Sequence, residues 1–116
     1  MNIEELRDYC LSKPHVTEGF PFDESTLVFK VAGKMFALTG LDKVPPSVNL
    51  KCDPERSLDL QEEYVQIQPG YHMNKKHWIT VEYSELATAF FYELVDHSYE
   101  LVVKSLTKKL RSELNL

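Results

Sequence analysis

The sequence has little glycine and little cysteine, and it contains no long apolar run. Only four glycines occur and none cluster, which excludes the glycine-rich loops that bind nucleotides. The two cysteines, Cys10 and Cys52, form neither a CxxC pair nor a disulfide framework. No apolar stretch approaches the about 20 residues that a membrane helix needs, and the acidic N-terminus does not resemble a signal peptide. We therefore expect a cytoplasmic protein with reduced thiols and no membrane association.

Signatures of catalysis and of metal binding are also missing. The nucleophile motif Gly-x-Ser-x-Gly does not occur, and neither cysteine has a base beside it in the sequence. Four residues separate His72 from His77, a spacing that matches no zinc signature, and the lysines between them oppose a cation. The sequence therefore predicts a protein that is not an enzyme and has no metal and no cofactor.

The composition is that of one ordinary globular domain. The chain has 116 residues, of which 43% are apolar and 27% charged, so residues 1–116 suffice for a single core. The net charge of −5 favours solubility and argues against general binding to nucleic acid. It leaves room for a local basic patch, because long-range attraction depends on how the charges are distributed.

The first half of the chain shows one helical and three extended patterns. Apolar spacing predicts a helix over 3–12, and β-branched and aromatic residues predict strands over 26–31, 34–39 and 47–51. The dipeptide Ala32-Gly33 predicts a hairpin turn between the first two strands. Residues 14–25 are predicted to be a polar connector, whose centre at Phe20–Phe22 is expected to pack under the sheet.

The second half predicts two further helices. Asp53-Pro54 is a helix start, so we expect a helix over 54–63, followed by extended residues 64–67 and a strand over 77–83. Ser84 is predicted to cap a long helix to Leu106, and Thr107 to begin a last basic turn. The order helix, three strands, helix, two strands, helix predicts an α+β fold, with a two-layer, mainly antiparallel sheet and helices on one face.

The stretch 69–78 is the most distinctive part of the sequence. It places lysines, histidines and an asparagine between a Pro-Gly turn and a tryptophan, with no acid among them. Lysines bind phosphate as point charges and aromatic rings stack on bases. The candidate phosphate- or DNA-binding residues are Lys75, Lys76, Lys34, Lys30, Asn74 and His72, with Tyr71 and Trp78 shaping the loop or stacking. The alternative is a solvated hairpin loop whose lysines keep a sheet edge soluble, with Trp78 in the core.

Several segments together resemble the MmcQ/YjbR family of small bacterial proteins. They are Phe-Pro-Phe-Asp at 20–23, Leu-Val-Phe-Lys-Val at 27–31, Gly-Lys-Met-Phe-Ala at 33–37, Val-Asn-Leu-Lys-Cys-Asp-Pro-Glu at 48–55, the whole of 69–78 and Asp-His-Ser-Tyr-Glu-Leu-Val at 96–102. One departure is Thr107, where the family often has proline, and it affects only the last helix boundary.

The resemblance implies a fold like that of secretion chaperones, and a DNA-binding role in which loops of the sheet act as two wings. Lys75 and Lys76 would lie in one wing, and the Ala32-Gly33 turn, flanked by Lys30 and Lys34, would be the tip of the other.

Three functions follow as hypotheses. The first is a DNA-binding or regulatory accessory protein that contacts the phosphates of double-stranded DNA and is a monomer or weak homodimer. The second is a chaperone-like protein-interaction module, which predicts an exposed apolar patch. The third is a small-ligand-binding domain, with a concave site built by Tyr71, His72, Trp78 and Lys51.

Overall fold

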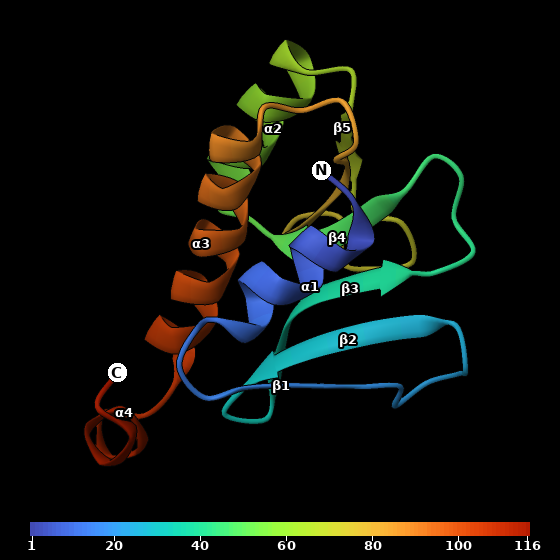
Figure 1. Ribbon diagram of the computed structural model, residues 1–116. Coiled ribbons are helices and arrows are strands. Elements are labelled where there is room, and N and C mark those ends of the chain that lie inside the picture. The colour runs from blue at the N-terminus through green and yellow to red at the C-terminus, as the bar shows by residue number, and fades with distance from the viewer.

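The chain forms a six-stranded antiparallel sheet with its helices on one face (Figure 1). The computed structural model describes residues 1–116, and the strands lie in the order β1-β2-β3-β4-β6-β5. The strands are β1 Val16–Gly19, β2 Thr26–Val31, β3 Lys34–Gly40, β4 Ser47–Lys51, β5 Ile67–Pro69 and β6 Trp78–Glu82. The helices are α1 Ile3–Leu11, α2 Pro54–Glu63, α3 Thr88–Ser105 and α4 Lys108–Leu114. The predicted α+β class is confirmed.

Local capping explains where the first two helices begin. The Asn2 side chain accepts a hydrogen bond from the backbone N–H of Glu5 at 2.9 Å and so caps α1. The Asp53 carboxylate accepts from the N–H groups of Glu55 and Arg56, and Pro54 occupies the first turn of α2. None of the helices is both long and apolar enough to cross a membrane.

The main core lies between the sheet and the helices. Alternate residues of the strands point into it, as the side-chain period of two requires. The sheet contributes Leu27, Phe29, Val31, Phe36, Val48, Leu50, Ile67, Ile79 and Val81, and the helices contribute Leu6, Cys10, Leu60, Phe91, Leu94, Val95, Tyr99 and Val102. The opposite face of the sheet, which we call the open face, carries no helix.

A side chain of α3 forms hydrogen bonds with the sheet where β3 has a bulge. Phe29 is paired with Ala37 and Lys30 with Met35, so Phe36 is an extra residue in β3. The ladder from β3 to β4 pairs only Ala37–Leu50 and Leu38–Asn49.

Beyond that point the Ser98 hydroxyl of α3 accepts from the Lys51 N–H at 2.8 Å and donates to the Phe36 carbonyl at 2.6 Å. Ser98 is fully buried, so two backbone groups that the bulge leaves free depend on one side chain.

Three predictions about the elements are wrong. Residues 64–67 were expected to be extended, but Val65 and Gln66 form a turn and β5 begins at Ile67. The connector 14–25 contains β1, which pairs with β2 from Val16–Val31 to Gly19–Val28. This strand is four residues long and lies at the sheet edge, so its own pattern is too short to reveal it. The order is therefore helix, four strands, helix, two strands and two helices. The long helix begins at Thr88 rather than after Ser84, and its N-cap, Ala87, makes no side-chain hydrogen bond.

The Ala32-Gly33 turn joins β2 and β3 as predicted. Both residues are left-handed, with φ of 49° and 82°, which matches the twist of a two-residue hairpin. Glycine adopts this region freely, whereas alanine is strained in it by about 1–2 kcal/mol. The turn is therefore well placed but is not optimal in sequence.

Candidate functional site

The open face carries a small apolar cluster of its own. Val28, Leu38 and Trp78 are buried there, and Met35 and Met73 pack against them. Trp78 is only 7% exposed, although it lies on the face without helices. Its ring is part of this cluster and offers solvent little surface for stacking on a base.

Residues 70–77, the 70–77 loop, fold back over the open face instead of projecting from it. The Tyr71 N–H donates to the Thr80 hydroxyl at 2.8 Å, and that hydroxyl donates to Asn49 Oδ1 at 2.6 Å. Asn49 Nδ2 in turn donates to the Tyr71 carbonyl at 3.1 Å. Both backbone groups of Tyr71 are thus held by a closed ring of hydrogen bonds to β4 and β6.

Two backbone features bring the loop close to the sheet. Gly70 donates to the Trp78 carbonyl at 2.9 Å, and a side chain at Gly70 would place its Cβ 2.6 Å from Trp78 Cβ. His72 is left-handed, with φ of 60°, a conformation that histidine tolerates better than most residues. Met73 then packs on the cluster of Leu38 and Trp78, so the loop is fixed on both sides of His72.

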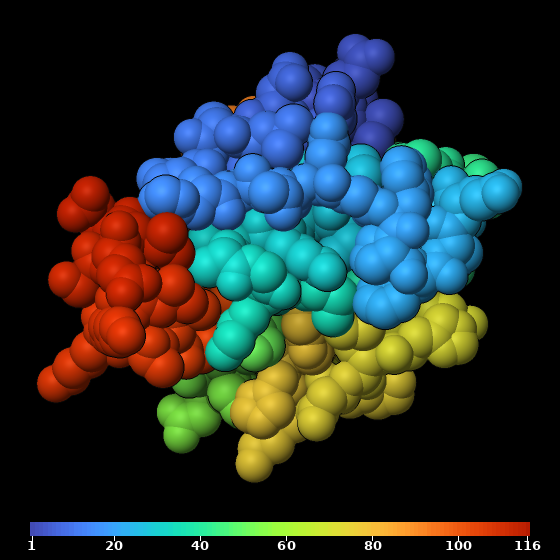
Figure 2. Space-filling model, turned by 90° about the horizontal axis from the view of Figure 1, so that it is seen from below, coloured from blue at the N-terminus to red at the C-terminus, as the bar shows by residue number.

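A hollow of about 350 Å³ lies beside this loop on the open face, and we call it the cleft. It is lined by Phe22, Thr26, Leu38, Gly40, Lys43, Asn49, Tyr71, His72 and Met73. Figure 2 views the molecule from below, where the 20–25 segment in lighter blue lies beside the 70–77 loop in yellow. The cleft therefore joins three loops that are distant in sequence.

Two side chains of the cleft have unused polar groups. Neither Lys43 nor His72 takes part in the three ion pairs of the chain, which are Arg7–Glu18, Lys13–Asp96 and Arg56–Glu93. The Lys43 Nζ lies 5.0 Å from the centroid of the Tyr71 ring, and the Tyr71 and His72 rings are 4.0 Å apart. Phe22 is 63% exposed and Tyr71 55%, so the cleft combines open aromatic surface with a cation.

A second hollow of similar volume lies near the N-terminus. It is lined in part by Met1, Ile3, Thr39 and Tyr83, and it shares Gly40 and Lys43 with the cleft. The Thr39 hydroxyl already donates to the Ser47 carbonyl at 2.8 Å. This hollow contains no histidine, and its one aromatic residue, Tyr83, is buried, so it is the weaker candidate.

The predicted site residues are only partly brought together. Tyr71 and His72 line the cleft, whereas Lys51 and Trp78, predicted for the same concave site, do not.

The two lysines of the predicted wing at the hairpin lie on different faces of the sheet. Directly paired residues point to the same side of a sheet, so the partner of each lysine shows its face. Lys30 pairs with Met35 of the open face, whereas Lys34 pairs with Val31 of the main core.

Lysines nevertheless gather at one end of the open face. β2 and β4 are both antiparallel to β3, so Lys30 and Lys51 lie at the same end of the sheet. Lys76 is close to this end because β6, which begins at Trp78, pairs with Lys51 there. Lys75 and Lys76 are exposed in the 70–77 loop, and Lys75 Nζ donates to the Gly70 carbonyl at 3.4 Å. Asn74 is occupied locally, because its side chain accepts from the Lys76 N–H at 2.9 Å.

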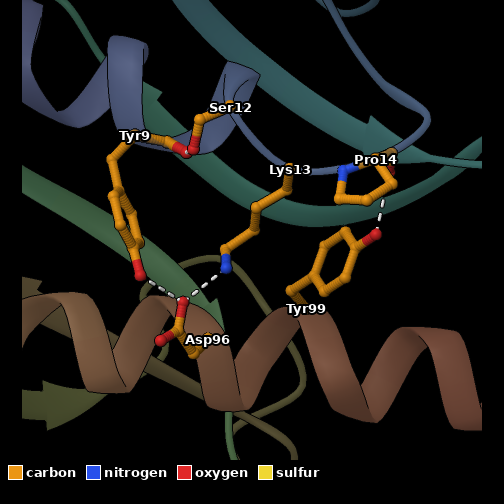
Figure 3. Close-up of polar contacts among 6 residues, drawn as sticks. All are labelled: Tyr9, Ser12, Lys13, Pro14, Asp96 and Tyr99. Atoms are coloured by element: carbon orange, nitrogen blue, oxygen red, sulfur yellow. Dashed lines mark hydrogen bonds and ion pairs between the residues drawn. The ribbon is translucent and has the colours of Figure 1, made fainter.

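A polar cluster between α1 and α3 was not predicted (Figure 3). Asp96 accepts from the Tyr9 hydroxyl at 2.6 Å and pairs with Lys13, whose side chain is only 16% exposed. The Tyr99 hydroxyl donates to the Pro14 carbonyl at 2.8 Å. The polar groups of this cluster bond to one another, so the cluster connects the end of α1 to α3 and offers no free site. Tyr9 and Asp96 are 87 residues apart, which leaves no local sequence signal.

The thiols and acids do not add a reactive centre. Burial raises the pKa of the Cys52 thiol to about 11 and also raises the pKa of Cys10, so both stay protonated at neutral pH. No three His, Cys, Asp or Glu side chains gather in a way that would hold a metal ion.

Sequence reasoning missed Lys43, Phe22 and Asn49 as site residues. Phe22 was expected under the sheet, yet it and Phe20 are exposed beside the open face. Lys43 lies in the loop between β3 and β4, and nothing near it in the sequence marks it. Asn49 lies in β4 between the buried Val48 and Leu50, so its side chain points to the open face.

Comparisons with known proteins agree on the family. A family model described as YjbR matches residues 11–101. The uncharacterised protein YbdF of Escherichia coli O157:H7 is 42% identical over 107 residues, which are 91% of this chain and 88% of that protein. The uncharacterised YjbR of Escherichia coli strain K12 is 34% identical over 112 residues, 96% of this chain and 95% of that protein.

Solved structures agree on the fold. The crystal structure of the Deinococcus radiodurans protein DR2400, a DUF419 domain, matches with a TM-score of 0.92 and 44% identity, covering 99% of this chain and 88% of that one. A Pseudomonas syringae protein matches with a TM-score of 0.75 and 28% identity, over 87% of this chain and 98% of that one. A shared fold does not by itself give a function, so the function is inferred from the site.

Proposed function

The chain belongs to the YjbR family, and we propose that it is a non-catalytic binding protein that holds a small ligand in the cleft. The observation that carries this proposal is a hollow of about 350 Å³ on the one sheet face that no helix covers. Ligand sites range from about 300 to 1,000 Å³ and combine apolar walls with a few free polar groups, so the volume suits a small molecule.

The lining of the cleft favours binding over chemistry. It contains one lysine and one histidine but no carboxylate and no thiol, so it lacks the paired groups that nucleophilic catalysis needs. The hydrogen bonds of Asn49 and Thr80 hold Tyr71 in place without a ligand. A wall that is already positioned reduces the ordering cost of binding.

Two naphthyl probes test this proposal, the anion naphthoate and the neutral naphthamide. At least one should shift the amide NMR signals of cleft residues such as Thr26, Leu38 and His72. Phe22→Ala should raise the dissociation constant about fivefold, which corresponds to the free energy of one aromatic contact. The matched control is Phe20→Ala, which removes a similarly exposed ring from outside the cleft and should leave the affinity unchanged.

The proposal fails if neither probe shifts the cleft signals, or if the two alanine variants weaken binding equally. Both rings are exposed, so neither variant removes a core side chain and both should fold.

DNA binding is the second candidate, and the lysines at one end of the open face favour it. Lys30, Lys51, Lys75 and Lys76 form no ion pair. Many acids of the chain lie on the helices, on the other side of the sheet, which lessens the effect of the net charge of −5. Phosphates are bound by such unpaired lysines, with little readout of bases.

Anisotropy of a fluorescent DNA duplex at low and near-physiological salt tests this second candidate. If the loop contacts phosphates, affinity falls with salt, and Lys75→Ala/Lys76→Ala makes the salt slope shallower by roughly 1 per lost contact. Lys108→Ala/Lys109→Ala on α4 is the matched control, because it removes the same charge from exposed positions elsewhere. Absence of binding at low salt, or an equal effect of both variants, contradicts the candidate.

A further inference from the structure

The electrostatics of the cleft select among small ligands. Lys43 is the only lysine or arginine that lines the cleft. No carboxylate lies within ion-pair distance of its Nζ. Its stem packs on Gly40, where an added Cβ would lie 2.9 Å from Lys43 Cγ. The Tyr71 ring, 5.0 Å from Nζ, further restricts the ammonium group.

His72 adds a second polar group on the same side. The neutral imidazole always keeps one N–H donor, so His72 can donate to an anion in either protonation state. Its ring lies against Tyr71, at a centroid distance of 4.0 Å. Lys43, Tyr71 and His72 therefore form a wall with donors for an acceptor-rich group.

The lining of the cleft also contains apolar side chains. Phe22 presents an exposed ring, and Leu38 and Met73 contribute aliphatic and thioether surface. The volume of about 350 Å³ is at the small end of ligand sites. A flat ring system of modest size would contact these three side chains at once.

The nearest acids do not cancel the attraction for an anion. The Asp23 carboxylate is directed at its own turn, where it accepts from the N–H groups of Ser25 and Thr26 and from the Thr26 hydroxyl at 3.1 Å. These hydrogen bonds lower the pKa of Asp23 and hold its ionised carboxylate on its own turn. Asp42 is exposed next to Lys43 and is not among the lining residues.

We infer that the ligand class of the cleft is a small aromatic or otherwise flat apolar anion, such as an arene carboxylate. Its acidic group lies between Lys43 and His72, and its ring lies against Phe22 and Met73. This inference rests on the proposed function, because it names the ligand of the same site.

The two naphthyl probes differ in the acidic group and separate the two claims. Naphthoate should bind the wild type about five- to tenfold more tightly than naphthamide, which is the range for one charge-assisted contact at a partly exposed site. Lys43→Met keeps the aliphatic stem and should remove this preference. Lys51→Met is the matched control, because Lys51 lies on the same face but outside the cleft, and it should keep the preference.

Each outcome decides a different claim. Equal binding of the two probes to the wild type overturns the anion class while leaving small-ligand binding in place. A preference that persists in Lys43→Met overturns the placement of the acidic group. If neither probe binds, the proposed function fails and the inference fails with it.

Discussion

Thr80→Val should release the 70–77 loop, because the Thr80 hydroxyl makes two of the three hydrogen bonds in the ring that holds Tyr71. Valine has nearly the same shape, so the change leaves little cavity. Each hydrogen bond contributes about 0.5–1.5 kcal/mol, and valine is a good strand residue that offsets part of the loss. We expect the free energy of opening the loop to fall by about 1–2 kcal/mol.

Native-state hydrogen exchange of the Tyr71 amide measures this directly. A loss of 1–2 kcal/mol corresponds to a roughly 5- to 30-fold faster exchange where local opening limits it. The amide of Val81, which lies in β6 and points its side chain into the main core, provides an internal reference that should change less. Thr17→Val is the control, since Thr17 is on the same face and its side chain makes no hydrogen bond within the chain.

The reasoning is refuted if Tyr71 exchanges at the same rate in Thr80→Val and in the wild type. The ring of hydrogen bonds would then not be what holds the loop. An equal acceleration in Thr17→Val would point instead to a general loosening of the sheet.

Three further predictions concern stability. Ser98→Ala should lower the free energy of unfolding, measured by urea denaturation, by about 2–4 kcal/mol, because it leaves two buried backbone groups unpaired. The control, Ser105→Ala in the same helix, should lower it by less than about 0.5 kcal/mol. Ala32→Asn should raise thermal stability by about 0.5–1 kcal/mol, since asparagine tolerates the left-handed turn better. Burial, and then Arg56, lower the pKa of His97, so stability should fall as pH drops from 7 to 5, and His97→Gln should reduce that fall.

The sign of the His97 effect follows from its environment. His97 Nε2 lies 3.2 Å from the Asp53 N–H and accepts from it in the neutral form. A pKa below that of the unfolded chain means that the unfolded chain binds the proton first. The stabilisation is therefore complete above the unfolded pKa and is lost as pH falls through the lower folded value.

Local chemistry explains which elements were predictable. Asp53-Pro54 determines the start of α2 because the cap and the proline act within one turn. The strands over 26–31 and 47–51 have clear β-branched or alternating patterns, and the structure has the same bounds. β1 is formed by pairing with β2 rather than by its own residues. The residues after Ser84 form a turn that buries Leu86, which outweighs the capping signal.

The site was predictable only where one segment contains it. The stretch 69–78 was identified from its own composition, and it does supply Tyr71 and His72 to the cleft. Lys43 and Phe22 come from other loops, and only the antiparallel order of the strands brings them together. The orientation of Trp78 depends on Val28 and Leu38 across the sheet, so the sequence left it open.

The most direct test of the account is to locate bound naphthoate by intermolecular nuclear Overhauser effects. If naphthoate occupies the cleft, the naphthyl protons should contact the methyl groups of Leu38 and Met73 and the Phe22 ring, all of which line the cleft. Contacts only to Ile3, Leu41 and Val44, in the hollow near the N-terminus, would contradict it.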